Sequence, residues 1–229
     1  FHGFCLRMLK EYAGFSRGLM EDELRLEILG LAAGAVTAAN GSAKGPSKKR
    51  LKQMDRMISL AKQQFLGPED DLSAVSEAAA GILPDIYRAY GSICRERNLA
   101  DFEDLIFDCH RMLVNDADIC ARVRQRFTHI FVDEYQDLNL GQYQLVKMLA
   151  RENRILVIGD PDQSIYGFRG SDNRFFKQFS HDYPGCEHIR LTRNYRSTQT
   201  ILDASFQMIT AKNAGPSEGR INEDRKIYS

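Results

Sequence analysis

Two short apolar runs that end abruptly in acidic residues constrain the fold of this chain more than any other feature. They read IFVDEYQD over residues 130–137 and ILVIGDPDQS over residues 155–164. Such runs, bounded by turn-forming residues, are typical of strands buried on both faces of a sheet. The acids then fall at the carboxyl end of each strand, where open α/β sheets place their ligand sites.

The residues after the first run suit nucleotide hydrolysis. Asp133 can hold the Mg²⁺ that bridges phosphate oxygens, and Glu134 can orient or deprotonate the attacking water. An acidic turn without catalytic role is the alternative, and the second run argues against it because that run carries its own acids and Gln163. A neutral amide can bind a terminal phosphate or position the water without competing for the metal.

Strands and helices alternate after residue 129, which predicts an α/β fold with a parallel sheet covered by helices. We expect strands at 129–132, 155–158 and 187–191, and helices near 140–150, 171–180 and 197–210. From about 19 to 100 the pattern is instead helical, with no convincing strand. Acids at 101–104 then open a further helix. The helical stretch is therefore expected to be an insertion into an α/β domain.

A basic segment lies within this helical stretch. Residues 44–62 contain seven basic side chains and one acid, Asp55. Such a segment can bind duplex phosphates in a salt-dependent way, and a solvated helix face is an equally good interpretation.

Bulk properties exclude several classes of protein. The formal net charge of the 229 residues is zero, so a nucleic-acid partner must be argued from local patches. The five cysteines are odd in number and contain no CxxC pair, which disfavours a disulfide framework or a zinc site and indicates buried thiols in a reducing cytosol. No 18-residue apolar run or signal sequence occurs, so we expect a soluble, cytoplasmic protein without membrane contact.

Two further segments carry aromatic and arginine side chains suited to ligands. In the glycine-rich loop 159–170, Tyr166 and Phe168 are two residues apart and can stack on unpaired bases, although core packing is the alternative. In LTRNYRS (191–197), Arg196 is a candidate arginine finger and Tyr195 can stack on a planar base. Taken by themselves, Arg196 and Tyr195 are better explained as a surface ion pair and a packing ring.

The phosphate-binding sequence GxxxxGK[ST] is absent from these 229 residues. The nearest candidate, GSAKGPSKK over residues 41–49, has the wrong spacing and lies between helices. Because the chain opens within an expected helix and closes at what looks like the start of a strand, we expect it to be part of a longer protein.

Together these motifs resemble the UvrD/Rep/PcrA family of superfamily 1 DNA helicases. FHGF (1–4) is similar to the family's TFHSF segment (motif Ib), with Gly3 in place of serine, and DFEDL (101–105) resembles its DFDDL element. VDEYQD (132–137), residues 159–170 and residues 191–197 resemble motifs II, III and IV. The resemblance implies a partial RecA-like P-loop NTPase domain (1–14 and 101–190), an inserted all-helical domain (15–100) and the start of a second RecA-like domain (191–229).

The resemblance also implies a nucleotide site for ATP and Mg²⁺. Asp133 would hold the metal, Glu134 would activate water, and Gln163 would sense the γ-phosphate and couple hydrolysis to DNA binding. Tyr195 would stack on the adenine and Arg196 would reach the γ-phosphate from the second motor domain. Arg169 would lie near the nucleotide or link it to the DNA loop.

Four residues would line single-stranded DNA: Phe1, His2, Tyr166 and Phe168. Family members often carry tryptophan in place of Phe168, so its stacking is expected to be weaker. A lone histidine such as His2 is as often a core or capping residue.

By this resemblance the whole protein is an ATP-dependent helicase that moves 3′ to 5′ on single strands and unwinds duplexes in DNA repair or replication. Its partners would be single-stranded DNA and single-strand/duplex junctions. We expect a monomer, with any dimer of this chain arising from an exposed sheet edge, and no appreciable ATPase activity from the chain alone. A non-catalytic DNA-binding or protein-interaction module, and part of a helicase–nuclease, are the alternatives.

Overall fold

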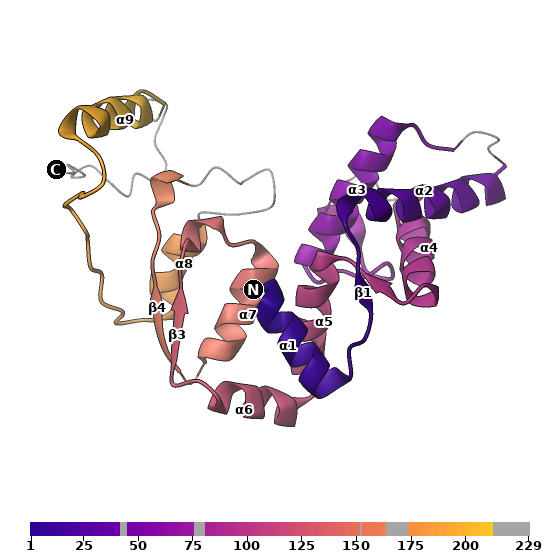
Figure 1. Cartoon of the computed structure of the whole chain (residues 1–229), viewed down its shortest axis with the longest axis horizontal. Helices are drawn as coiled ribbons and strands as arrows, with labels where there is room; N and C mark the ends of the chain where they lie inside the picture. The colour runs from indigo at the N-terminus through magenta and orange to yellow at the C-terminus, as the bar shows by residue number, and fades with distance from the viewer. Residues whose placement is uncertain (42–44, 76–80, 152, 164–173, 213–229) are drawn as a thin grey trace. The chain divides into compact units, whose positions relative to one another are not determined.

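The computed structural model describes residues 1–41, 45–75, 81–151, 153–163 and 174–212, and the chain divides into two compact units, 1–176 and 177–229. The helices and strands of the first unit are shown in Figure 1. In order they are α1 (His2–Ala13), β1 (Gly18–Leu19), α2 (Asp22–Ala39), α3 (Lys48–Gln63), η1 (Leu72–Ala74), α4 (Leu83–Glu96), β2 (Leu99–Ala100), α5 (Phe102–Asn115), α6 (Ala117–Gln125), β3 (His129–Val132), η3 (Tyr135–Asp137), α7 (Leu140–Ala150), β4 (Arg154–Val157) and η4 (Pro161–Gln163). Helix α8 (Arg174–Asp182) crosses the boundary, and α9 (Gln199–Lys212) lies in the second unit.

Strands β3 and β4 form a parallel pair joined through α7, as the apolar runs predicted. The register pairs His129 with Arg154 and Val132 with Val157. A parallel pair needs a crossover connection, and α7 supplies it; the capping box of Asn139 and Gln142 fixes where that helix begins. The chain is therefore α/β, with helices and short parallel sheets.

The prediction that these strands are buried on both faces is wrong for this chain. Ile130 packs against a hydrophobic core, but Phe131 is 71% exposed and Leu156 is 43% exposed. Successive side chains of a strand point to opposite faces, and the described helices cover only one of them.

The strand predicted at 187–191 is also wrong, because these residues form no strand and Leu191 is 85% exposed. An apolar segment becomes a strand only where a neighbouring strand accepts and donates its backbone hydrogen bonds. By contrast, the helix predicted near 197–210 is confirmed as α9.

The helical block, defined here as residues 20–98, leaves and rejoins the rest of the unit at one place. Strands β1 and β2 pair there in parallel, with Gly18 opposite Leu99 and Leu19 opposite Ala100. The expectation of no strand between 19 and 100 therefore fails at both ends of this stretch. Two-residue strands are too short for any periodic pattern to show them.

Two separate hydrophobic cores support the first unit. One lies among α2, α3 and α4 of the helical block, and its most deeply buried side chains include Ile28, Ile58 and Ile86. The other joins α1, α5, α6 and α7 through residues such as Met8, Leu105 and Leu145. Four of the five cysteines are buried, as predicted, while Cys186 is half-buried.

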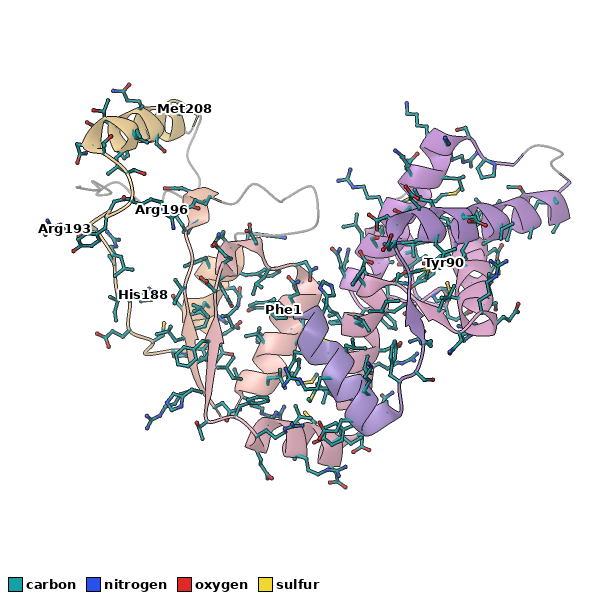
Figure 2. All side chains as sticks on the ribbon, viewed as in Figure 1. Phe1, Tyr90, His188, Arg193, Arg196 and Met208 are labelled. Atoms are coloured by element: carbon teal, nitrogen blue, oxygen red, sulfur yellow. The ribbon has the colours of Figure 1, made fainter. Side chains whose placement is uncertain are left out.

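A buried ion cluster connects the helical block to α5. Lys62 of α3 is 4% exposed, and its Nζ lies 2.5 Å from Asp101 Oδ2 and 2.6 Å from Asp104 Oδ1. The Tyr90 hydroxyl, labelled in Figure 2, donates to the same Asp101 oxygen at 2.8 Å. Arg25 of α2 pairs with Glu103 at 2.9 Å. This cluster fixes the amino-terminal end of α5 against the helical block.

Asp101 also caps α5, as the acids at 101–104 predicted. Its Oδ1 accepts from the Asp104 N–H at 2.9 Å, while the Asp104 carboxylate accepts from the Asp101 N–H at 3.0 Å. Burial disfavours the charge of Asp101, but Lys62 and Arg25 outweigh it and lower the pKa of Asp101 to about 2. The same carboxylate thus begins a helix and balances a buried lysine.

None of the helices in the described part of the chain is both long enough and apolar enough to cross a membrane.

Candidate nucleotide site

The carboxyl ends of β3 and β4 lie side by side and bring the predicted catalytic acids to one edge of the sheet. Backbone pairing continues past both strands, because the Ile158 N–H donates to Val132 at 2.8 Å and the Tyr135 N–H donates to Ile158 at 3.0 Å. Asp133 and Glu134 follow the first strand, and Asp160 follows the second. This is the edge at which parallel sheets hold ligands.

Glu134 is held in an uncommon backbone conformation. Its φ is +51°, in the left-handed region, and its N–H donates to Asp133 Oδ1 at 2.9 Å. Left-handed backbone costs a residue with a side chain about 1–2 kcal/mol. Both acids are exposed, and neither forms an ion pair with any of the described residues. Negative charge is thus concentrated at a sharp turn facing solvent.

Asp137 adds a third carboxylate to this turn. Its Oδ1 is buried without a hydrogen-bond partner among the described residues. Burial, together with the charge of Glu134, raises the pKa of Asp137. An unpartnered buried oxygen beside two exposed acids suits a site that binds a cation, because the oxygen can then accept a hydrogen bond from a water molecule on that cation or contact the cation itself.

The donor set fits Mg²⁺ rather than a metal held wholly by protein. No group of three or more His, Cys, Asp or Glu side chains could hold a metal ion among the residues described. Mg²⁺ is usually bound through one or two carboxylates, with waters and substrate phosphates completing its octahedron. Asp133 can supply that carboxylate.

Gln163 lies in the short helix η4 that follows β4. Its Nε2 donates to Asp160 Oδ2 at 3.0 Å, and its side chain is exposed. The structure therefore brings Gln163 to the same edge as Asp133 and Glu134. Arg169, Tyr166 and Phe168, which the sequence placed nearby, lie outside the described residues.

The sequence reasoning gave no role to Gln136, which lies at the centre of this site. Its side chain is 2% exposed and contacts both Glu134 and the backbone of Asp160. A buried glutamine directly after a strand was the available signal, but its partners could not be read from the sequence.

His2 is the first residue of α1, and Phe1, labelled in Figure 2, is its N-cap. Phe1 is 41% exposed. The half-buried His2 ring meets the edge of Phe102, with 5.7 Å between centroids, and burial lowers the pKa of His2. Phe102 is itself 45% exposed, so FHGF and DFEDL share one partly open aromatic surface.

Tyr195 and Arg196 belong to the second unit and precede α9 in the chain; Arg196 is labelled in Figure 2. The Asn194 carboxamide accepts from the N–H groups of Arg196 and Ser197, both at 2.8 Å, and so shapes the turn before the helix. Tyr195 is 85% exposed, and the Arg193 guanidinium lies 5.2 Å from its ring centroid. The Tyr195 ring is therefore not packed into a core formed by the described residues of the second unit.

The basic segment divides into two kinds of residue. Lys62 is buried in the ion cluster and cannot bind a phosphate, which corrects its inclusion in the predicted patch. Five others on α3 are exposed: Lys48, Lys49, Arg50, Lys52 and Arg56. Lys44 lies outside the described residues.

Comparison with known proteins bears on this geometry directly. The family profile described as the UvrD/REP helicase N-terminal domain matches residues 1–184. This chain belongs to the UvrD/REP helicase family. The match covers both strand ends with their acids, and the RecA-like fold of such helicases fits the parallel pair observed here.

Three relatives illustrate how the UvrD/REP match extends along the chain. An ATP-dependent DNA helicase PcrA from Leuconostoc citreum is 40% identical over 69% of this chain and 21% of its own length. DNA helicase II from Escherichia coli is 42% identical over 56% of this chain and 18% of its own length. The ATP-dependent DNA helicase UvrD1 from Mycobacterium bovis is 35% identical over 98% of this chain and 30% of its own. The chain thus spans less than a third of these relatives.

Proposed function

We propose that the whole protein containing this chain is an ATP-dependent DNA helicase, which moves 3′ to 5′ on single strands and opens duplexes at junctions during DNA repair or replication. The observation that carries the proposal is the meeting of Asp133, Glu134 and Gln163 at one sheet edge. Membership of a helicase family supports the same chemistry.

In this proposal Asp133 holds Mg²⁺, which would neutralise charge on the phosphates of ATP. Glu134 accepts a proton from the water that attacks the γ-phosphorus, and Gln163 contacts the γ-phosphate. Tyr195 stacks on the adenine and Arg196 supplies positive charge to the same phosphate. Arg169 completes the nucleotide surroundings.

We propose that DNA contacts come from Phe1, His2, Tyr166 and Phe168 for the single strand. The exposed basic residues of α3 would contact the duplex beside a junction. The exposure of Phe1 and Phe102 beside His2 supports a stacking surface at the start of α1.

The domain division proposed from the sequence has separate support. The helical block has its own hydrophobic core, which shares no residue with the core formed by α1, α5, α6 and α7. We therefore propose that residues 15–100 are an insertion into a RecA-like domain (1–14 and 101–190), and that 191–229 begin a second one. We propose a monomer, in which the exposed strand faces are covered by other parts of the protein.

The first experiment is to read the parent reading frame upstream of Phe1 and look for GxxxxGK[ST] after an apolar strand. Its presence would supply the phosphate-binding loop that these 229 residues lack. Its absence would contradict the ATPase proposal and favour a non-catalytic DNA-binding module.

The second experiment tests the catalytic assignment. In the full-length protein, Glu134→Gln removes the proton acceptor while keeping its shape, so DNA-stimulated ATP turnover should fall about 10²–10⁴-fold. The 229-residue chain by itself should show no DNA-stimulated turnover. Wild-type turnover in Glu134→Gln, or robust turnover by the isolated chain, would contradict the proposal.

A further inference from the structure

Gln136 uses both ends of its carboxamide to join the two strand ends. Its Nε2 donates to Glu134 Oε2 at 2.6 Å, and its Oε1 accepts from the Asp160 N–H at 2.9 Å. The Gln136 side chain is 2% exposed, so the amide that makes both bonds is buried, while its partner Glu134 is exposed. One buried amide therefore connects the carboxylate after β3 to the backbone after β4.

The connection continues to Gln163. The Asp160 carboxylate accepts from Gln163 Nε2 at 3.0 Å through Oδ2, and from the Asp162 N–H at 3.1 Å through Oδ1. A continuous hydrogen-bonded path thus runs from Glu134 through Gln136 and Asp160 to Gln163. It links the proposed proton acceptor to the proposed γ-phosphate contact.

The orientation of the Gln136 amide is fixed by its surroundings. Turning it by half a rotation would set its oxygen against the Glu134 carboxylate and its NH₂ against the Asp160 N–H, which are both repulsive arrangements. The backbone of Gly159 lies close to the same amide. A Cβ added at this position would overlap Gln136 Oε1 and would lie 3.0 Å from the Tyr135 nitrogen. Hydrogen bonding and close packing together therefore select one orientation of the Gln136 amide.

We propose that Gln136 is a positioning residue for ATP hydrolysis. It holds the Glu134 carboxylate in position to accept a proton, and it couples the position of that carboxylate to the conformation of the segment that carries Gln163. This inference rests on the proposed function. A neutral amide suits the task, since it donates to one carboxylate oxygen and leaves Glu134 Oε1 able to accept a proton. A cation in its place would lower the basicity of Glu134.

Two substitutions in the full-length protein separate positioning from simple packing. Gln136→Met keeps the volume and removes both hydrogen bonds, so DNA-stimulated kcat should fall about 10–100-fold. The KM for ATP should change much less, because Gln136 is not proposed to touch nucleotide. Gln142→Met is the matched control: Gln142 Oε1 also accepts from a backbone N–H, that of Asn139 at 3.1 Å, and this bond belongs to the cap of α7. It should leave kcat unchanged.

Gln136→Glu should change the pH dependence of kcat if Gln136 positions Glu134, and should leave it unchanged if Gln136 serves packing alone. Its carboxylate would face Glu134, and two such groups in hydrogen-bond contact retain a shared proton to higher pH. Two other acids among the described residues also lie beside Glu134: Asp133, whose Oδ1 accepts from the Glu134 N–H, and Asp137, whose pKa the charge of Glu134 raises. The acidic limb of the kcat profile should therefore move to higher pH, and turnover should recover as pH rises.

Glu134→Gln, measured in parallel, distinguishes two kinds of failure. If Glu134→Gln turns over ATP normally, the proposed function fails and this inference fails with it. If Glu134→Gln is inactive while Gln136→Met keeps wild-type kcat, only the inference is overturned. A kcat loss in Gln136→Met that is accompanied by a lower melting temperature and an unshifted Gln136→Glu profile would also overturn it, because it would indicate packing alone.

Discussion

The first unit contains two groups of carboxylates in opposite settings. Around the start of α5, Asp101 and Asp104 are enclosed with Lys62, so the protein itself supplies the balancing charge. At the ends of β3 and β4, Asp133 and Glu134 face solvent without an ion-pair partner among the described residues. The first arrangement stabilises a junction between segments, and the second leaves negative charge available to an external cation.

The contrast shows how similar clusters of acids can be told apart. A buried carboxylate is tolerated only when it is paired and hydrogen-bonded, so its neighbours reveal a structural role. The exposed pair Asp133 and Glu134 is held by the Gln136 amide and by one backbone N–H, neither of which cancels its charge. Substitutions in the first group should therefore change stability, whereas those in the second should change activity.

Lys62→Met should produce the largest loss of stability. Removing the ammonium leaves Asp101 and Asp104 buried beside each other, and breaking a buried pair in this way costs about 3–5 kcal/mol. Urea unfolding of the 229-residue chain, followed by circular dichroism, measures the change. Lys52→Met, on an exposed site of the same helix, is the control and should stay within about 0.5 kcal/mol. Equal midpoints for the two variants would contradict the structural role of the cluster.

Asp101→Asn should cost about 2 kcal/mol at neutral pH, since it keeps a capping oxygen but loses the charge whose pKa is lowered to about 2. A carboxyl group whose pKa is lower in the folded than in the unfolded protein stabilises the fold at pH values above the unfolded pKa. This stabilisation is lost as the pH falls through the folded pKa. The advantage of wild type over Asp101→Asn should therefore be complete above about pH 4 and disappear as pH falls toward 2.

Urea unfolding at several pH values tests this dependence. Asp116→Asn, which alters the cap that Asp116 Oδ1 provides to the Ile119 N–H of α6, is the matched control. A constant difference between wild type and Asp101→Asn down to pH 2 would show that the charge of Asp101 is not what stabilises the cluster.

Glu134→Gly should have the smallest effect on stability, and in the opposite direction. Glycine adopts a φ of +51° without a Cβ clash, so the chain should gain about 1 kcal/mol while the full-length protein loses ATP turnover. Thermal unfolding of wild type and Glu134→Gly tests this. Asn98→Gly, at φ +54°, is the comparison and should gain less, because asparagine tolerates left-handed backbone and its Nδ2 donates to the Ser16 carbonyl at 3.3 Å. A destabilised Glu134→Gly would mean that the bond to Gln136 outweighs backbone strain.

The sequence predicted what depends on neighbouring residues along the chain. The strand at 129–132, the helix at 140–150 and the acidic start of α5 each follow from local periodicity or capping, and each is confirmed. Contacts across long separations were not predictable. The Lys62–Asp101 pair spans 39 residues, and the bond from Asp160 to Gln136 spans 24. The strand expected at 187–191 failed for the same reason, because a strand depends on a partner as well as on its own residues.

The pairing of β1 with β2 has a consequence for how such a protein can change over evolutionary time. Because Gly18 lies opposite Leu99, the segments that enter and leave the helical block are hydrogen-bonded neighbours, about 5 Å apart. A gene segment encoding residues 20–98 can therefore be lengthened or exchanged through one pair of splice points, provided that the new segment makes the crossover that parallel strands require and supplies a cation to Asp101 and Asp104. The register of the strands that carry the acids would be unchanged by such an exchange.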